Sequence, residues 1–275
     1  MWIFCCGMLR SGSTLHYQLT KELVELKNLG YGLGWAEGEK FYDLYEKHRH
    51  NNTIKVIKIH RYIPKAKELT VAGEAKIIHV YRDVRDIVVS ILNKDKKSFW
   101  DIIRANLLQS LVIESKSWCN LESALVSKYE DMVDDLPKET KKIAEYLEIN
   151  LEEGLADRIA LNFSIEQQKK RIKQFNFNLQ GERTGINVHD PNSLLHQNHI
   201  FSGKKGQWQT SLSAIKIGLI EDFTYKWLDS RNYKISQTLL MRKIAKISYF
   251  FYKSILKAKR ILKAISKSLF SKDSR

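Results

Sequence analysis

The sequence W-I-F-C-C-G-M-L-R-S-G-S-T occupies residues 2–14. Its first five residues are apolar and predict a buried strand. Leucines follow at positions 15, 19, 23 and 26, with the spacing of one face of a helix. Between the two lies a glycine-rich turn with small hydroxyl residues, and a turn of this kind at a helix N-terminus binds phosphate through its backbone N–H groups. The stretch therefore predicts a strand, an anion-binding turn and a helix.

The turn Gly7–Thr14 fits the nucleotide-binding pattern G-x-x-x-x-G-K-[ST] except at one position, because Ser13 stands in place of the lysine. In nucleoside triphosphate enzymes that lysine reaches the β- and γ-phosphates, so its absence argues against ordinary ATP or GTP chemistry. Arg10, inside the turn, supplies a cation from another direction. A glycine-rich turn without a ligand is the alternative for this motif taken alone.

Composition sets the broad class of the protein. The chain has 275 residues and 43% hydrophobic content, which suits one large α/β domain or two small ones. Its cysteines are Cys5, Cys6 and Cys119, and they form neither a disulfide framework nor a metal-ligand pattern. No signal peptide and no apolar run of transmembrane length is apparent. These features predict a cytoplasmic protein without a metal site.

The net charge of +15 is concentrated at the end of the chain. Residues 241–275 contain eleven Lys or Arg against one acid, so +10 lies there and +5 remains for the other 240 residues. A mildly basic body suits a polyanionic small molecule and does not require nucleic acid.

Alternating strands and helices are predicted beyond the first turn. Strands are expected over 54–60, 75–81 and 123–129, and helices over 37–50, 82–92, 99–117, 137–147, 151–161 and 212–227. The glycines of 30–34 are expected to end the first helix. Strands separated by helices predict a mostly parallel sheet flanked by helices, the three-layer α/β fold of P-loop NTPases.

Two segments differ from this pattern. Periodicity fails between about 171 and 206, which predicts a lid or acceptor loop without regular structure. Residues 236–275 are predicted to form a basic amphipathic helical tail after a catalytic domain of residues 1–235, because large apolar residues recur in the tail at spacings of three and four. Such a helix lies on an anionic membrane surface, covers a partner, or packs on its own domain.

Four short motifs fall at the predicted strand ends, where an open α/β sheet binds its ligand. The first is the turn itself, including Arg10-Ser11-Gly12-Ser13-Thr14. The second is Lys58-Ile59-His60, in which a cation and an imidazole point to the same side. The third pairs Arg82 with Ser90 across a strand-to-helix turn, as a grip for a second phosphate. The fourth is Tyr129-Glu130-Asp131-Met132, with an aromatic ring for a purine.

Together these motifs resemble the sulfotransferases that use PAPS, 3′-phosphoadenosine 5′-phosphosulfate. R-S-G-S-T occupies the place of that family's K-S-G-T-T, and Lys58-Ile59-His60 is similar to its K-x-H. Arg82, Asp86 and Ser90 have the spacing of its R-x-x-x-D-x-x-x-S, and Y-E-D-M recurs at 129–132. A late G-x-x-G-x-W occurs at Gly203-Lys204-Lys205-Gly206-Gln207-Trp208.

The resemblance implies a role for each motif. His60 is the general base, with Lys58 and Arg10 stabilising charge on the transferred group. Ser11, Gly12, Ser13 and Thr14 hold the 5′-phosphosulfate, and Tyr129 contacts adenine. The 3′-phosphate is held by Arg82, Ser90 and the segment Gly203, Lys204 and Lys205. PAP is the product, no metal is required, and the acceptor is a small molecule with a hydroxyl or amine.

Two departures from the family pattern stand out. Leu15 replaces the tryptophan that stacks on adenine after the turn, and Phe201-Ser202-Gly203 replaces an R-K-G segment. The opening residues are similar to bacterial sulfotransferases of secondary metabolism, including those acting on saxitoxin-like guanidinium alkaloids. The alternatives are an atypical P-loop kinase of small molecules or nucleotides, and a non-catalytic module that binds a membrane surface or nucleic acid. The oligomeric state does not follow from the sequence.

Overall fold

The computed structural model of the chain describes residues 1–95, 98–184, 187–200 and 203–270. The chain divides into two compact units, Met1–Gly206 and Gln207–Arg275. The boundary at 235 that the sequence suggested remains a prediction, and each unit is described by itself below.

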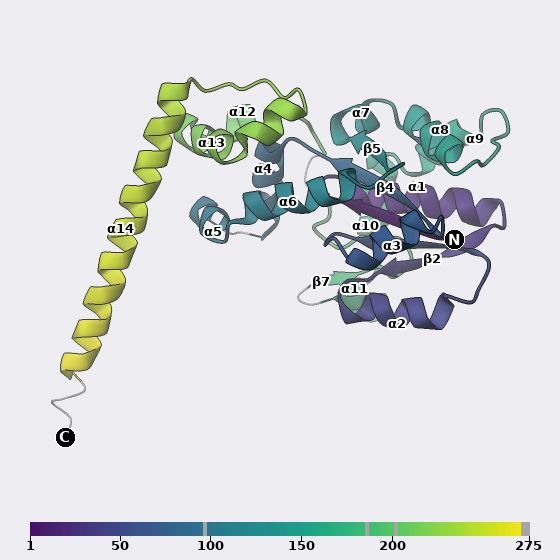
Figure 1. Ribbon diagram of the computed structural model, residues 1–275, viewed down its shortest axis with the longest axis horizontal. Coiled ribbons are helices and arrows are strands. Elements are labelled where there is room, and N and C mark those ends of the chain that lie inside the picture. Colours follow the sequence, from purple (N-terminus) through teal and green to yellow (C-terminus); the bar gives the residue numbers. More distant parts are fainter. Residues whose placement is uncertain (96–97, 185–186, 201–202, 271–275) are drawn as a thin grey trace. The chain divides into compact units, whose positions relative to one another are not determined.

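A five-stranded parallel sheet forms the centre of the first unit (Figure 1). Its order is β2-β3-β1-β4-β5. The strands are β1 (Trp2–Gly7), β2 (Gly30–Trp35), β3 (Ile54–Ile59), β4 (Ala75–Tyr81) and β5 (Leu125–Lys128). The predicted α/β fold with a parallel central sheet is confirmed. β1 lies between β3 and β4, so the chain runs from β1 to one side of the sheet and later adds β4 on the other side. Folds of this kind bind ligands at the carboxyl end of the strand where this reversal occurs.

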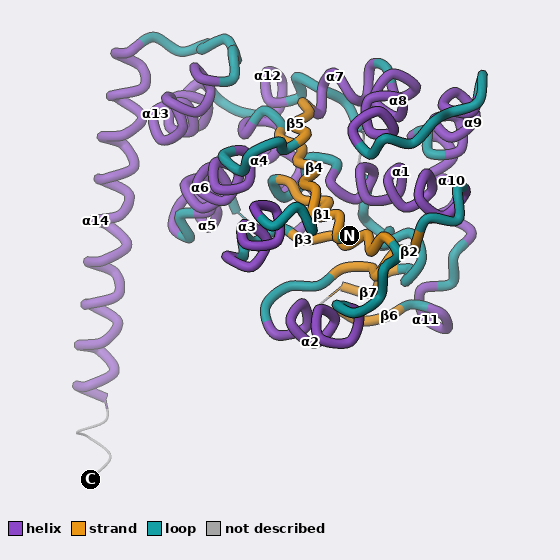
Figure 2. The backbone as a smooth tube through the Cα atoms, turned by 45° about the vertical axis from the view of Figure 1, so that its right-hand side comes forward, coloured by secondary structure: helices purple, strands orange, loops and turns teal. Residues whose placement is uncertain are grey.

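Helices cover both faces of this sheet (Figure 2). The helices form two groups, one on each face. Ile3, Cys5 and Val56 pack against the first group, and Trp2, Phe4 and Cys6 pack against the second. The first group is α1 (Ser13–Leu26), α8 (Leu136–Tyr146) and α9 (Leu155–Asn162). The second is α2 (Glu39–His48), α3 (Pro64–Val71) and α6 (Leu107–Cys119). The fully apolar β1 is thus buried on both sides, as the sequence predicted.

Strand β2 was not predicted from the sequence. Its residues read G-Y-G-L-G-W, a composition that intrinsic strand preference disfavours. The structure needs the glycines, because a Cβ at Gly30 would lie 1.9 Å from the Ile54 carbonyl oxygen and one at Gly32 would lie 2.5 Å from the Tyr17 hydroxyl. Close approach to β3 and α1 therefore explains the glycines that the sequence analysis took only as a helix end.

Two further expectations were wrong in detail. The helix expected over 99–117 is divided into α5 (Phe99–Arg104) and α6, with Asn106 in the left-handed region at φ 51°. The segment 171–206 was expected to lack regular structure, yet its described part contains the end of a helix, a short helix and a hairpin. These elements are α10 (Ile165–Gln174), α11 (Phe177–Gln180), β6 (Glu182–Thr184) and β7 (Asn187–His189).

The second unit consists of helices. These are α12 (Trp208–Ser211), α13 (Ala214–Ser230) and α14 (Leu239–Phe270). Of the helical tail predicted over 236–275, α14 covers residues 239–270, whereas 236–238 precede the helix and 271–275 fall outside the described part of the chain. Within the described residues, no helix is both long and apolar enough to cross a membrane.

Candidate active site

The site lies at the carboxyl edge of the sheet, where the turn after β1 leads into α1. Gly12 caps α1 with φ +91°, a left-handed conformation that favours glycine. A Cβ there would lie 2.7 Å from Cε of Met132 and 2.9 Å from the Tyr129 ring, so no larger residue fits. The turn is therefore packed directly against α7 (Tyr129–Asp134), the helix that carries the Y-E-D-M motif.

The hydroxyl residues of the turn have two different positions. Ser11 is buried, and its hydroxyl bonds within the fold to the carbonyl oxygens of Met8, at 2.6 Å, and Val80, at 3.0 Å. Ser13 and Thr14 begin α1 and line a cavity instead. Since no described side chain caps this helix end, the first N–H groups of α1 are available to bind an anion. Ser11 thus shapes the turn, and Ser13 and Thr14 face the cavity.

His60 follows β3 and is held from several sides. Its Nδ1 lies 2.9 Å from the Gly7 carbonyl oxygen. A carbonyl only accepts, so Nδ1 carries the hydrogen and Nε2 keeps its lone pair. The His60 backbone N–H donates to Oε1 of Glu37 at 3.0 Å, and its carbonyl accepts from the Trp118 indole at 2.9 Å. The fold therefore fixes His60 in the tautomer that a general base needs.

Burial keeps His60 uncharged and brings the pKa of Lys58 close to neutrality. Burial, together with the positive charge of Lys58, lowers the pKa of His60 to about 3. Burial also lowers the pKa of Lys58 to about 8, while Glu37 opposes this shift and Lys94 and Arg10 add to it. At pH 7 the site thus combines a neutral imidazole with a mostly protonated lysine, the charge states of a base and an electrostatic stabiliser.

Arg10 connects the turn with two distant segments. Its backbone is in the left-handed region at φ 64°. Its Nε donates to the Ser90 hydroxyl at 2.9 Å, and its terminal nitrogen donates to the His199 carbonyl oxygen at 2.7 Å. Ser90 belongs to α4 (Val84–Asp95), so this side chain brings together the two predicted phosphate grips and the segment after β7.

Arg82 is the second buried cation of the site. Its guanidinium stacks on the Tyr129 ring at 4.2 Å and donates to the carbonyl oxygens of Arg10 and Lys204, at 3.2 and 2.9 Å. The Asp86 Oδ2 atom lies 3.8 Å from the Arg82 Nη2 atom and balances the charge of the guanidinium. The Arg82 Nε is buried, and it has no hydrogen-bond partner among the described residues. A buried guanidinium N–H in this state is costly, so a ligand acceptor here would stabilise the site.

The segment 203–206 closes one side of the site. Asp86 accepts from the Gly206 N–H at 2.7 Å, and the Tyr129 hydroxyl donates to the Gly203 carbonyl at 3.0 Å. Lys205 forms an ion pair with Asp134, and Lys204 is exposed. Phe201 and Ser202, which replace the R-K of the family pattern, lie outside the described residues. The predicted grip at 203–205 thus reaches the site through its backbone.

A cavity of about 230 Å³ opens beside Arg10, Lys58 and His60. Apolar contacts come from Leu9, Trp35 and Leu194. Its remaining lining residues are Gly12, Ser13, Thr14, Lys94, His189, His196 and His199. Burial lowers the pKa of all three of these histidines, that of His196 to about 3. Among the described residues, no group of three or more His, Cys, Asp or Glu is placed to hold a metal ion.

Trp35, Glu37 and Lys94 were not predicted as site residues. Trp35 and Glu37 come at the end of β2 and just after it, and recognition of β2 as a strand parallel to β3 would have placed them at this edge. Lys94 is one helical turn beyond Ser90 on α4, so the two share a side of that helix. The spacing of four residues from Ser90 could therefore have identified Lys94 as a site residue. No comparable pattern in the sequence identified β2 as a strand, and Trp35 and Glu37 were missed for that reason.

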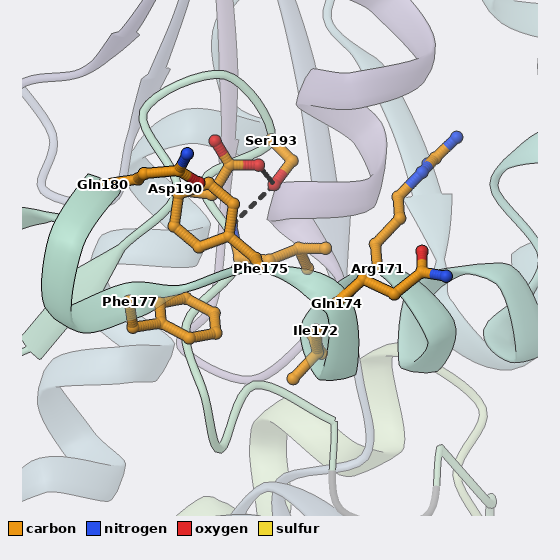
Figure 3. Close-up of a pocket in the computed structure, with 9 residues that line it drawn as sticks. Arg171, Ile172, Gln174, Phe175, Phe177, Gln180, Asp190 and Ser193 are labelled. Atoms are coloured by element: carbon orange, nitrogen blue, oxygen red, sulfur yellow. Dashed lines mark hydrogen bonds between the residues drawn. The ribbon is translucent and has the colours of Figure 1, made fainter.

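A second cavity, also of about 230 Å³, lies between α10, α11 and the loop after β7 (Figure 3). The rings of Phe175 and Phe177 meet edge to face with centroids 4.9 Å apart, and Ser193 donates a hydrogen bond to Asp190 nearby. Its lining contains none of the residues that carry the predicted chemistry. We therefore place the candidate reaction in the cavity at His60.

Comparisons with known proteins bear on the family and the fold. A family model described as "Sulfotransferase domain" matches residues 3–230. The chain is similar in fold to mouse sulfotransferase SULT7A1 complexed with PAP, with TM-score 0.59, 18% identity, and coverage of 90% of this chain and 87% of the other. It is also similar to retinol dehydratase in a complex with retinol and PAP, with TM-score 0.57, 18% identity, and coverage of 82% and 81%. No curated protein sequence matches the chain.

Proposed function

Because the chain belongs to the sulfotransferase domain family, we propose that it transfers a sulfuryl group from PAPS to a hydroxyl or amine of a small molecule. The observation that carries this is the position of His60. Its Nδ1–H is fixed on Gly7 of the anion-binding turn, which leaves Nε2 as a proton acceptor beside Lys58 and Arg10.

The residues present suit a bisphosphorylated nucleotide. The uncapped N-terminus of α1, with Ser13 and Thr14, would hold the 5′-phosphosulfate. The 3′-phosphate would be held by the Ser90 hydroxyl and by the buried Arg82, whose Nε lacks a partner in the part of the chain that the structure describes. PAPS supplies an activated sulfuryl group, and both similar structures contain PAP.

His60 and Lys58 divide the chemical work. Nε2 of His60 accepts the proton of the acceptor hydroxyl or amine as that group becomes a nucleophile. As the bond between sulfur and the bridging oxygen of PAPS breaks, the Lys58 ammonium and the Arg10 guanidinium stabilise the negative charge that builds up on that oxygen, which leaves with PAP. Glu37 holds the His60 and Arg61 backbone N–H groups at 3.0 and 3.3 Å, which keeps the imidazole in place.

The cavity lining favours an uncharged acceptor. Arg10, Lys58 and Lys94 line it, and no carboxylate is found among its described lining residues. The buried Nδ1 of His199 has no partner within residues 1–95, 98–184, 187–200 and 203–270, which suits a hydrogen bond to an acceptor hydroxyl. A guanidinium alkaloid of the saxitoxin type would bring another cation into this cluster. That acceptor, and a role in secondary metabolism, stay predictions.

We also propose a cytoplasmic location. In the described part of the chain, Cys5 and Cys6 are buried thiols that form no disulfide bond. Unpaired thiols are typical of a reducing compartment.

Incubation with PAPS and a panel of acceptors tests the function. The panel holds phenols, aliphatic alcohols, amines and a guanidinium alkaloid, and PAP formation is the readout. We expect acceptor-dependent PAP release that persists in EDTA, with uncharged hydroxyl acceptors turned over best.

A P-loop kinase would behave in the opposite way, because phosphoryl transfer relies on a divalent ion. ATP-dependent turnover that EDTA abolishes, with none from PAPS, would contradict the proposed reaction. Turnover of cationic acceptors alone would contradict the acceptor class and leave the sulfuryl transfer intact.

The pH dependence of kcat/KM follows from the pKa values of the free enzyme. The reaction needs neutral His60, which is available above about pH 3, and protonated Lys58, which is lost above about pH 8. We therefore expect a plateau from pH 5 to 7 and a tenfold fall per pH unit above 8. Lys58→Arg should remove this alkaline limb, because arginine stays protonated. An acid limb near pH 6.5 would show that His60 has an ordinary pKa.

A further inference from the structure

Helix α14 has an exposed apolar stripe along its length. We define it by Ile244, Ile247, Phe251, Ile255 and Leu262, whose spacings of three, four, four and seven place them on one side of a helix. All five are exposed, from 44% for Ile244 to 67% for Phe251. The sequence repeats the spacing at Ile265 and Leu269.

Within the second unit, α13 covers a different side of α14. Ala245 and Tyr249 are the buried residues there. A Cβ at Gly218 would lie 3.3 Å from the Ala245 Cβ, and the Phe223 and Tyr249 rings lie 5.8 Å apart. An ion pair of 3.0 Å joins Lys246 to Asp222. Since successive helical residues are about 100° apart, the stripe lies on the side of α14 away from this packing.

The charge of α14 has a single sign. Its residues 239–270 contain nine Lys or Arg and no Asp or Glu. In the described part, Lys243, Lys253, Lys257 and Lys259 are exposed. Exposed apolar residues gathered in a stripe, with cations over much of the remaining helix surface, are typical of helices that lie in the interface of an anionic membrane.

We infer that α14 binds the surface of a bilayer containing anionic phospholipid, with the apolar stripe inserted among the headgroups. Lipid fits both parts of this surface, because it covers apolar side chains and neutralises lysines. A second copy of α14 would set nine cations against nine, which opposes pairing through the stripe. A nucleic acid would neutralise the lysines and leave large aliphatic side chains in water.

Co-sedimentation of the full chain with vesicles tests this. We expect binding to phosphatidylcholine vesicles that contain about a third phosphatidylglycerol, and little binding to pure phosphatidylcholine. Lys253→Gln, Lys257→Gln and Lys259→Gln together should weaken binding by roughly 100-fold, about fivefold per lysine. Phe251→Ser with Ile255→Ser should weaken it at least roughly tenfold.

The matched control replaces equally exposed apolar residues outside α14. Val71→Ser with Leu161→Ser, at 77% and 67% exposure, should leave vesicle binding unchanged. Unfolding temperature, light scattering and binding to a DNA duplex are measured on the same proteins. Equal binding to neutral vesicles would overturn the inference. Binding to DNA but not to vesicles would also overturn it. A dimer that dissociates in the Phe251→Ser with Ile255→Ser variant would show that the stripe pairs with a second copy. A lower unfolding temperature of that variant, in a protein that does not bind vesicles, would show that the stripe packs on its own domain.

Discussion

Replacing His60 with asparagine is expected to lower kcat by about 10²- to 10⁴-fold, the usual contribution of a general base. Asparagine carries an amide nitrogen near the position of Nδ1, so the bond to the Gly7 carbonyl oxygen can persist. The lone pair of Nε2 is lost. The anion-binding turn should therefore stay in place, and PAP affinity, measured by calorimetry, should change by less than about twofold.

Two companion variants separate the base from the scaffold. His50→Asn changes an exposed histidine and should keep full activity. Glu37→Gln keeps an oxygen that accepts from the His60 backbone N–H, but it removes the negative charge that raises the pKa of Lys58. It should therefore lower the alkaline pKa of the kcat/KM profile and have a smaller effect on kcat. A His60→Asn enzyme with near-normal kcat would assign proton removal to another group.

Sequence reasoning located the parts of the site that follow strand ends. Gly7, Lys58, Arg82 and Tyr129 each come at or next to the end of an apolar or alternating strand, and parallel strands bring those ends to one edge. The motifs were therefore visible as neighbours before any contact was known. The tautomer of His60 was not, because it depends on the Gly7 carbonyl, 53 residues away in the chain.

The remaining lining residues depend on long-range packing. Trp35 reaches the cavity only because the glycines of β2 allow close approach to β3 and α1. His196 and His199 reach it through the fold of the segment after β7, where His199 accepts a hydrogen bond from Arg10 across 189 residues. Local periodicity carries no information on such contacts, so the sequence showed the residues proposed to bind PAPS better than those proposed to contact the acceptor molecule.

Replacing Arg82 with lysine is expected to raise the Kd of PAP by roughly 10- to 150-fold, the effect of losing one charged hydrogen bond of about 1.5–3 kcal/mol. Lysine keeps the positive charge but cannot stack on Tyr129 and donate as a planar fork. Its ammonium also cannot replace the buried Nε–H, for which the described residues offer no partner. Calorimetric titration with PAP measures the change, and Arg158→Lys, at an exposed arginine, is the control.

A second ligand separates a 3′-phosphate grip from a structural role of Arg82. AMP lacks the 3′-phosphate, so its Kd should change little in Arg82→Lys, and the preference for PAP over AMP should collapse. The side chain also donates to the carbonyl oxygens of Arg10 and Lys204, and a loss of that scaffold would weaken both ligands equally. Ser90→Ala removes only a hydroxyl and should reduce the same preference by a smaller factor. If the Kd values of PAP and AMP rise equally in both variants, the 3′-phosphate does not bind to Arg82 and Ser90. The Arg82 Nε would then have no phosphate oxygen as its hydrogen-bond acceptor.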